Sequence, residues 1–422
     1  MHKTPLLDQL ESGPYPSFVK DLKRLAAQKP QVADLLGQLE RSYKEKITHW
    51  KHGGIVGVLG YGSGIIGRYS DLPDEFPGLE HFHTMRINQP SGWYYTTEAL
   101  RELCDIWDKH GSGVLNMHGA TGDIIFLGCH TDNLEPCFAD LTAKGWDIGG
   151  SGSAMRSPSC CLGQSRCEWS CYDTMEACYQ LTQEFQFDLH RPSFPYKYKL
   201  KFSGCPNDCV ASVARSDMSM IGVWKDDIRI DQSAVQAYAG GEIKPRGGAT
   251  PYDKIDVKLD VTDLCPTACM DWDGKTLKIR NADCNHCMHC INMMPRALRP
   301  GTDLGCTILL GSHAPILEGA QMSWVIVPFM RMEAPFEELK DLTYKITEWW
   351  AEEGKNRERV GELIMRMGMR TFLEAVELPP VPQTVKIPRA NPFFFWYQSD
   401  FDAEAAGRKY YTKEGFGSFK TE

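Results

Sequence analysis

The chain has 422 residues, 42% of them hydrophobic and 24% charged, so it is long enough to fold as two or three domains with sizeable cores. A formal net charge of −9 and the lack of a basic run argue against general nucleic-acid binding. No apolar run reaches the ~18 residues that a membrane-spanning helix needs, and the polar start MHKTPLLDQLESG differs from a signal peptide. We therefore expect a cytoplasmic protein, in which sixteen cysteines are better explained by metal ligation than by disulfides.

A glycine motif comes first along the chain. Gly62-Ser-Gly64-Ile-Ile-Gly67 matches G-x-G-x-x-G after the strand-like IVGVLG. A dinucleotide fold would need a helix next and an acidic residue about 20 positions further on. The chain instead continues as RYSDLPDEFPG, whose prolines interrupt a helix, so we reject a dinucleotide site. Two interpretations stay open: a loop that holds another anionic cofactor with Arg68, or a plain tight turn.

The following part predicts a mixture of helices and strands. Residues 96–110 place Leu100, Leu103, Ile106 and Trp107 on one helical face. The segments GVLNMHG and DIIFLG are typical of strands, NLEPCFADLTAKG of a helix and WDIGG of a further strand. This alternation predicts a ferredoxin-like α/β sandwich, and hence an α+β fold class.

Two cysteine pairs stand in the centre of the chain: Cys161-x5-Cys167 in SCCLGQSRC and Cys205-x3-Cys209 in GCPNDC. The pattern resembles the signature of sulfite and nitrite reductases, whose four thiolates hold a [4Fe-4S] cluster coupled to siroheme. The resemblance implies that these four cysteines are the ligands and that the sulfur of Cys209 also bridges to the siroheme iron. Cys160 and Cys171 are close enough in sequence to replace one of them, so the ligand set stays open here.

A run of lysines precedes the second pair. In FPYKYKLKF, strand alternation puts Lys197, Lys199 and Lys201 on one face, where three like charges need a counter-anion. A solvated strand face is the ordinary alternative, but tyrosines and the cysteines bracket the run. The resemblance implies a pocket for the substrate anion, whose catalytic residues hold the anion, supply protons and stabilise developing charge: Arg86, Arg156, Lys197 and Lys199. We add Arg68, Lys201 and Cys209 as cofactor-binding residues.

A second cysteine run, CNHCMHCINMMP, nearly repeats the ferredoxin pattern C-x2-C-x2-C-x3-C-P, with Met294 at the position of the fourth cysteine. Cys265-Pro266 lies upstream, and the intervening DWDGKTLKIRNAD predicts a hairpin that returns the chain to the run. We interpret one [4Fe-4S] site with these ligands: Cys265, Cys284, Cys287 and Cys290. A zinc knuckle is the alternative, and Cys269 is a competing ligand that is better explained as a buried thiol.

Glycine- and proline-rich segments mark the ends of this module, which we expect to be an insertion at 239–302. The flanking domain then comprises 156–238 and 303–422, after an N-terminal domain at 1–155. Past the insertion, TILLG and SWVIVPF are typical of strands, and 335–352 and 356–376 of helices. The aromatic tail from Pro379 is too hydrophobic for a free linker, so we expect it to cover a neighbouring surface.

Several further motifs, among them THWKHGGIVGV, RSDMSMIGVWKDDIRID and EEGKNRERVGELI, together with the inserted module, resemble the alpha-subunit family of dissimilatory sulfite reductases over nearly the whole chain. The resemblance implies siroheme, or its iron-free form, and two [4Fe-4S] clusters per chain. It also implies a heterotetramer of two alpha and two homologous beta subunits with active sites between them. The partners would be sulfite, an electron-donor complex and the small sulfur-carrier protein DsrC.

Two rival functions remain. The first is a reverse-type enzyme, which oxidises reduced sulfur to sulfite with the same residues. The second is a non-catalytic electron-transfer or scaffold subunit, and the intact set of arginines and lysines speaks against it. The segments HTMRINQPSGWYY and CYDTMEACYQLT favour the reducing branch.

Overall fold

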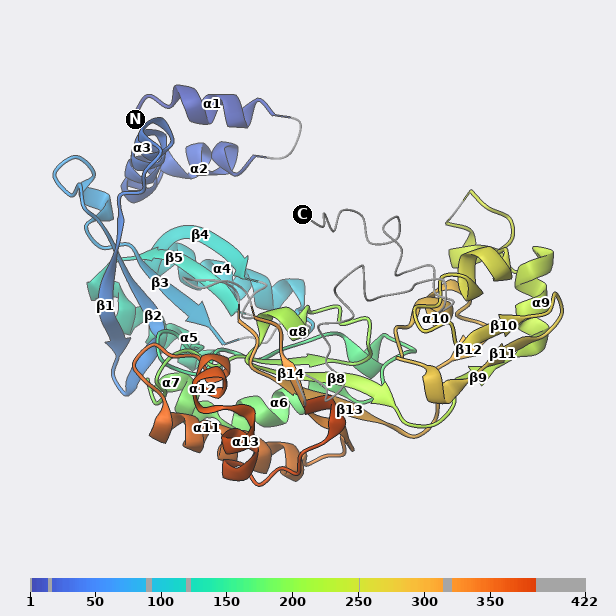
Figure 1. Cartoon of the computed structure of the whole chain (residues 1–422). Helices are drawn as coiled ribbons and strands as arrows, with labels where there is room; N and C mark the ends of the chain where they lie inside the picture. Colours follow the sequence, from blue (N-terminus) through green and yellow to red (C-terminus); the bar gives the residue numbers. More distant parts are fainter. Residues whose placement is uncertain are drawn as a thin grey trace, which may run out of the picture.

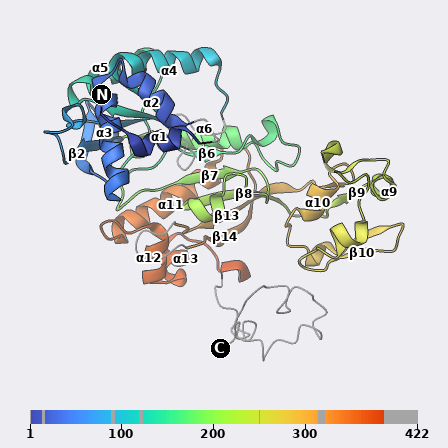
Figure 2. The same cartoon turned by 90° about the horizontal axis from the view of Figure 1, so that it is seen from above.

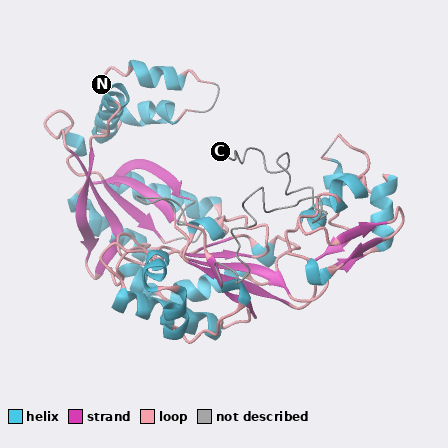
Figure 3. Ribbon diagram, in the orientation of Figure 1, coloured by secondary structure: helices cyan, strands magenta, loops and turns pink. Residues whose placement is uncertain are grey.

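A computed structural model describes residues 2–13, 17–88, 93–118, 123–249, 251–313 and 321–384. It places a central sheet between a first sheet with its N-terminal helices and an outlying module (Figures 1 and 2). The first two parts each combine helices with a five-stranded sheet, whereas the sheets of the module have two strands each (Figure 3). Most of the aromatic tail, including 391–422, lies outside the described residues.

Three helices open the chain: α1 (Pro5–Glu11), α2 (Phe18–Ala26) and α3 (Pro30–Glu45). Proline begins α1 and α3, where its missing N–H costs no hydrogen bond. The Glu40 carboxylate accepts from the backbone N–H of Leu6 at 2.9 Å and of Leu7 at 3.0 Å, which satisfies free donors at the start of α1. The helices therefore form a small bundle with its own core, which includes Val32 and Leu36.

The first sheet is antiparallel throughout, in the order β1-β2-β3-β5-β4. Its strands are β1 (Trp50–Val58), β2 (Tyr61–Ser70), β3 (His83–Ile87), β4 (Gly111–His118) and β5 (Asp123–Cys129). Side chains alternate between its faces: Phe126 packs under α4 (Thr97–His110) and α5 (Leu134–Ala143), and Leu127 packs toward the N-terminal helices. The expected helix over 96–110 and both expected strands are confirmed, whereas WDIGG forms only an isolated bridge, Ile87 to Ile148.

The glycine motif lies inside β2, so the prediction of a loop or tight turn was wrong. Its glycines permit close packing instead. Gly64 has φ +90°, and a Cβ there would lie 2.7 Å from the carbonyl oxygen of Gly149. A Cβ on Gly67 would lie 2.9 Å from the backbone of Gly53 on the paired strand. The glycines of the motif therefore allow close packing of a strand and do not form a cofactor-binding loop.

The central sheet has the order β14-β13-β8-β7-β6 and mixes parallel and antiparallel pairs. Its strands are β6 (Ser159–Cys160), β7 (Leu200–Ser203), β8 (Met218–Trp224), β13 (Leu304–Leu310) and β14 (Trp324–Met330). Apolar side chains of one face pack against the following helices: α6 (Thr174–Glu184), α7 (Gln186–His190), α11 (Glu337–Glu353), α12 (Val360–Met367) and α13 (Met369–Ala375). The helix expected over 356–376 is thus two helices, which meet at Gly368 with φ +94°.

The insertion module lies between β8 and β13. It contains β9 (Arg229–Ile230), α9 (Gln232–Gly240), β10 (Met270–Trp272), β11 (Leu277–Ile279), α10 (His289–Met293) and β12 (Leu298–Arg299). The expected hairpin is confirmed, because β10 pairs with β11 across Asp273-Gly274. Strand β9 pairs with β12, and α9 shares the module's core, so we propose that the module extends over 225–303 instead of starting at 239.

No helix among the described residues has the length and apolarity required to cross a membrane.

Candidate active site

The four central cysteines meet where parallel strands end. Cys161 directly follows β6, and Cys205 and Cys209 follow β7, which runs parallel to β6. Loops that follow parallel strands leave the sheet at the same edge. The backbone N–H of Gly204 donates to Cys161 Sγ at 3.2 Å. Burial raises the pKa of Cys209, and the neighbouring Cys161 and Cys167 raise it further, so the thiols face one another.

The two competing cysteines are distinguished by where they point. Cys160 is buried on the apolar face of the sheet with Cys178. Burial and a hydrogen bond with Cys160 hold the pKa of Cys178 well above its ordinary value. Cys171 Sγ lies 3.6 Å from the carbonyl oxygen of Trp169, and burial raises its pKa to about 12. The geometry separates Cys160 from the four cysteines and leaves Cys171 at their edge.

The second cysteine set surrounds a space of about 380 Å³ in the insertion module. The following cysteines line it: Cys265, Cys269, Cys284, Cys287 and Cys290. Apolar side chains such as Val261 and Ile291 complete the wall. Met294 is fully buried in the module's core and does not line the space, so the position of the missing fourth cysteine is an ordinary core position.

Cys265 and Cys269 lie close together, with their sulfur atoms 3.5 Å apart. Burial raises the pKa of Cys265, but backbone N–H groups of Cys269 and Thr267 outweigh it and leave that pKa below its ordinary value. Burial raises the pKa of Cys269 to about 12. The fold therefore disfavours the thiolate form at Cys269 and not at Cys265. In the described part of the chain, no three Cys, His, Asp or Glu side chains are grouped as a site for a single metal ion.

A group of largely buried cations lies where strands β6 and β7 begin, and the central cysteines follow the other ends of these strands. Burial, and then the neighbouring Arg86, lower the pKa of Arg156 to about 9, although Asp123 acts in the opposite direction. Arg156 Nη1 donates to the carbonyl oxygens of Gly152 at 2.8 Å and of Ala154 at 3.1 Å. Arg86 forms an ion pair with Asp123 at 2.9 Å. Both arginines are thus held in place within a region that excludes most water.

The lysines divide into two groups. The pKa of Lys199 is lowered to about 8, mainly by burial and also by Arg359, Lys197 and Arg156, against the opposite effect of Asp217. Lys201 lies apart from this group: its Nζ donates to Ser159 Oγ at 2.9 Å. Burial lowers its pKa, and Asp208, between the last two cysteines, opposes that effect. Lys197 and Lys199 therefore share the space of Arg156, whereas Lys201 lies by the cysteine loop.

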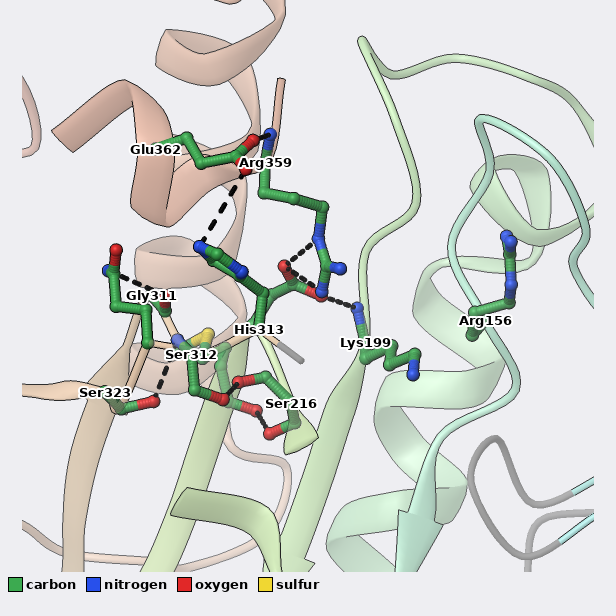
Figure 4. Close-up of polar contacts among 12 residues, drawn as sticks. Arg156, Lys199, Ser216, Gly311, Ser312, His313, Ser323, Arg359 and Glu362 are labelled. Carbon is green, nitrogen blue, oxygen red and sulfur yellow. Dashed lines mark hydrogen bonds and ion pairs between the residues drawn. The ribbon is translucent and has the colours of Figure 1, made fainter. Parts of the chain in front are cut away.

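Arg359 is a member of this site that the sequence analysis missed. Its guanidinium donates to both carboxylate oxygens of Asp217, from Nε at 2.8 Å and from Nη2 at 2.7 Å. The same carboxylate accepts from the backbone N–H of Lys199 at 2.9 Å. Figure 4 shows Arg359 and Lys199 meeting at that carboxylate, with Arg156 on the neighbouring segment. The buried pair thus fixes the strand that presents Lys199.

Arg68 lies in a wide groove over the exposed face of the first sheet. Arg86 and His118 also line this groove. Arg68 Nη1 lies 3.1 Å from His52 Nε2, and burial lowers the pKa of Arg68. The pKa of His52 is lowered by burial and then by Arg68 and Arg357. Arg68 and Arg86 therefore both place positive charge along the groove.

Comparison with known proteins places this arrangement in a family. A model of the nitrite and sulphite reductase 4Fe-4S domain matches residues 151–381, and a model of the ferredoxin-like half domain of the same enzymes matches residues 77–144. The alpha subunit of dissimilatory-type sulfite reductase from Nitratidesulfovibrio vulgaris is 56% identical over 94% of this chain and 95% of its own length. The chain belongs to the alpha-subunit family of dissimilatory-type sulfite reductases.

Other relatives agree with this assignment. The corresponding subunit of Allochromatium vinosum is 43% identical over 93% of this chain and 94% of its own length. A crystal structure of dissimilatory sulfite reductase I matches with 51% identity and a TM-score of 0.89, over 100% of this chain and 98% of that one. The predicted family, α+β fold class and oxidoreductase activity are confirmed.

Proposed function

We propose that the chain is the alpha half of an enzyme that reduces sulfite toward sulfide. The observation that carries this proposal is the group of largely buried cations at the start of the two strands that the four central cysteines follow. Arg156 and Lys199 lose much of their hydration in the fold, which disfavours their charged forms. A bound anion reverses that penalty, and sulfite offers three oxygen atoms to such donors.

The residues present fit the family's cofactors. The central set, Cys161, Cys167, Cys205 and Cys209, is assigned to a [4Fe-4S] cluster coupled to siroheme or its iron-free form. The second set, Cys265, Cys284, Cys287 and Cys290, is assigned to a second [4Fe-4S] cluster. Trp224 lines that second space, and its buried indole N–H has no partner among the residues that the structure describes, which a cluster sulfide would supply. Arg68 and Lys201 are assigned to the carboxylates of the macrocycle. When bound, siroheme and its cluster supply electrons to the sulfur atom.

The protein's own side chains would bind the anion and handle protons. Each oxygen that leaves sulfite as water consumes two electrons and two protons, so complete reduction takes six of each. Lys199, with a pKa of about 8, is suited to hold and release a proton near neutral pH. Arg86, held by Asp123, and Arg156, held by two carbonyls, would orient the oxygens and stabilise their developing charge. Lys197 would add a second proton donor.

The assembly belongs to the same proposal. Both relatives above are named as alpha subunits, which supports a complex with a homologous beta subunit. We assign the insertion module to receiving electrons from a donor complex and DsrC to accepting the reduced sulfur. A scaffold role is not favoured, because it gives no reason to keep three cations buried together. An enzyme that works in the oxidative direction would use the same residues, so an activity assay has to distinguish the two directions.

The test is co-expression with and without a beta subunit. The complex should consume electrons from reduced methyl viologen only when sulfite is present, and it should form sulfide. The chain expressed alone should lack this activity. A complex that binds both cofactors but neither consumes electrons with sulfite nor releases them with sulfide would refute the proposal. A faster reaction from sulfide than from sulfite would reassign it to the oxidative direction.

A further inference from the structure

The two cysteine sites are joined by a pair of asparagine side chains. Asn207 stands between Cys205 and Cys209, and Asn292 stands two residues after Cys290 in α10. Asn207 Nδ2 donates to Asn292 Oδ1 at 3.1 Å, and Asn292 Nδ2 donates to Asn207 Oδ1 at 2.7 Å. Two amides that each donate and accept fix both side chains in one orientation. Figures 1 and 2 place α10 on the side of the module that faces the central sheet.

Each end of this pair continues to a cysteine through the chain. Asn207 is two residues from Cys205, and Asn292 is two residues from Cys290. A continuous series of covalent and hydrogen bonds therefore runs from the sulfur of Cys205 to the sulfur of Cys290. Both cysteines also lie in one buried apolar cluster, so little water separates the two sites.

Attachment of the module does not require this pair. The module is already held by the shared apolar core. The Asp226 carboxylate accepts from the backbone N–H of Thr302 at 2.8 Å and from its hydroxyl at 2.7 Å, which joins the module's two ends to each other where they leave β8 and enter β13. An amide pair placed between two sets of cluster ligands therefore suggests a role beyond attachment.

We propose that the Asn207–Asn292 amide pair is the route by which electrons pass from the insertion's cluster to the central cluster. In each transfer the insertion's cluster is oxidised by one electron and the central cluster is reduced by one, and no bond is made or broken. Electron tunnelling weakens steeply with distance and is stronger through covalent and hydrogen bonds than through gaps. The pair replaces a gap between two loops with bonded atoms. This inference rests on the proposed cofactors, and both asparagines are positioning residues.

The test follows electrons between the clusters in the assembled complex. Flash-photoreduced deazaflavin injects electrons, and freeze-quench EPR records the appearance of the central cluster's reduced signal. Asn207→Ala and Asn292→Ala should each lose the fast phase of that signal. The double variant should be no slower than either single variant, because both changes interrupt one route. Redox titration should show unchanged potentials for both clusters, so that the loss reflects coupling and not driving force.

Gln232→Ala is the matched control. The Gln232 side chain also makes two reciprocal amide bonds, with the backbone of Leu277 at 2.7 and 3.0 Å, within the module and away from the cysteines. It should keep the fast phase. Unchanged transfer in the asparagine variants would overturn the proposal, as would loss of a cluster from them, since the pair would then only support cluster binding. A native complex without two clusters on this chain would refute the proposed function before any variant is compared.

Discussion

The central site and the insertion site use cysteines in opposite ways. The central cysteines come from two loops that meet only because β6 and β7 run parallel, and the same two strands begin at a group of largely buried cations. The insertion's cysteines come mostly from the single run 284–290, with Cys265 brought back by a short hairpin, and their space is lined by apolar side chains. The first arrangement suits chemistry on an anion. The second suits storage and transfer of electrons.

Because of this difference, the two sites depend on different parts of the molecule. The central site requires the whole domain, including a strand position fixed by the Asp217–Arg359 pair. The insertion site takes its cysteines from segments next to the hairpin and α10, and of the described residues of the central sheet only Trp224 also lines its space. Damage to the central site should therefore affect catalysis and cofactor binding together, whereas damage to the insertion should affect electron supply alone.

The largest difference should follow loss of one ligand from each site. Cys205→Ser should abolish sulfite reduction and retention of the macrocycle on this chain. Cys265→Ser should remove only the insertion's cluster and slow electron delivery, while Met294→Ala should leave the iron content unchanged. Iron and acid-labile sulfide analysis measures the loss of a cluster, and turnover assays measure the loss of sulfite reduction. Full iron in the Cys265 variant, or iron loss in the Met294 variant, would show that the insertion's ligands are assigned wrongly.

Breaking the buried pair should destabilise the central domain. Asp217→Ala leaves the Arg359 guanidinium buried without its counter-charge, which typically costs about 3–5 kcal/mol. Denaturant unfolding should show this loss. Glu374→Ala breaks the exposed pair with Arg370 and should change stability by no more than about 0.5 kcal/mol. Equal effects of the two changes would mean that the buried pair does not fix the Lys199 strand.

Loss of one buried cation should slow catalysis without affecting either cluster. Arg156→Ala or Lys199→Ala should reduce sulfite turnover by on the order of 100-fold, as expected for one oriented group at developing charge. Lys345→Ala, on the exposed side of α11, is the control and should keep full turnover. Undiminished turnover in both test variants would show that Arg156 and Lys199 do not form an anion site.

The smallest effect should be a dependence on pH. Burial lowers the pKa of Lys199 to about 8, so its charge is present below that pH and is lost as the pH rises through it. The protonated fraction falls to about a tenth one unit above the pKa. The kcat/KM for sulfite should fall accordingly above pH 8. The Lys199→Arg side chain should keep its charge, so the decrease in kcat/KM should move to higher pH. A decrease at the same pH in this variant would show that another group causes it.

Local pattern predicted much of this molecule. The periodicity of 96–110 gave α4, and the turn at Asp273-Gly274 gave the hairpin, because both depend on neighbours in sequence. The spacing of the cysteines similarly indicated two groups, which the fold places in two separate spaces. The break at Gly368 was missed because helical periodicity continues across it.

Long-range pairing could not be predicted. Arg359 and Asp217 are 142 residues apart, and neither segment shows that the two will be buried together. The only available signal was an aspartate next to the apolar strand MSMIGVW, which needs a counter-charge once buried. The glycine motif failed for a similar reason. Its close contacts are with Gly53 and Gly149, which the motif itself does not contain.

The central claim is that one chain holds two unlike clusters, of which only one is coupled to an anion site. EPR-monitored redox titration of the assembled complex, with and without sulfite and with and without Cys265→Ser, tests it most directly. The account predicts one cluster signal that sulfite shifts and Cys265→Ser leaves in place, and a second that Cys265→Ser removes and sulfite does not shift. A single signal, or two signals that both respond to sulfite, would contradict it.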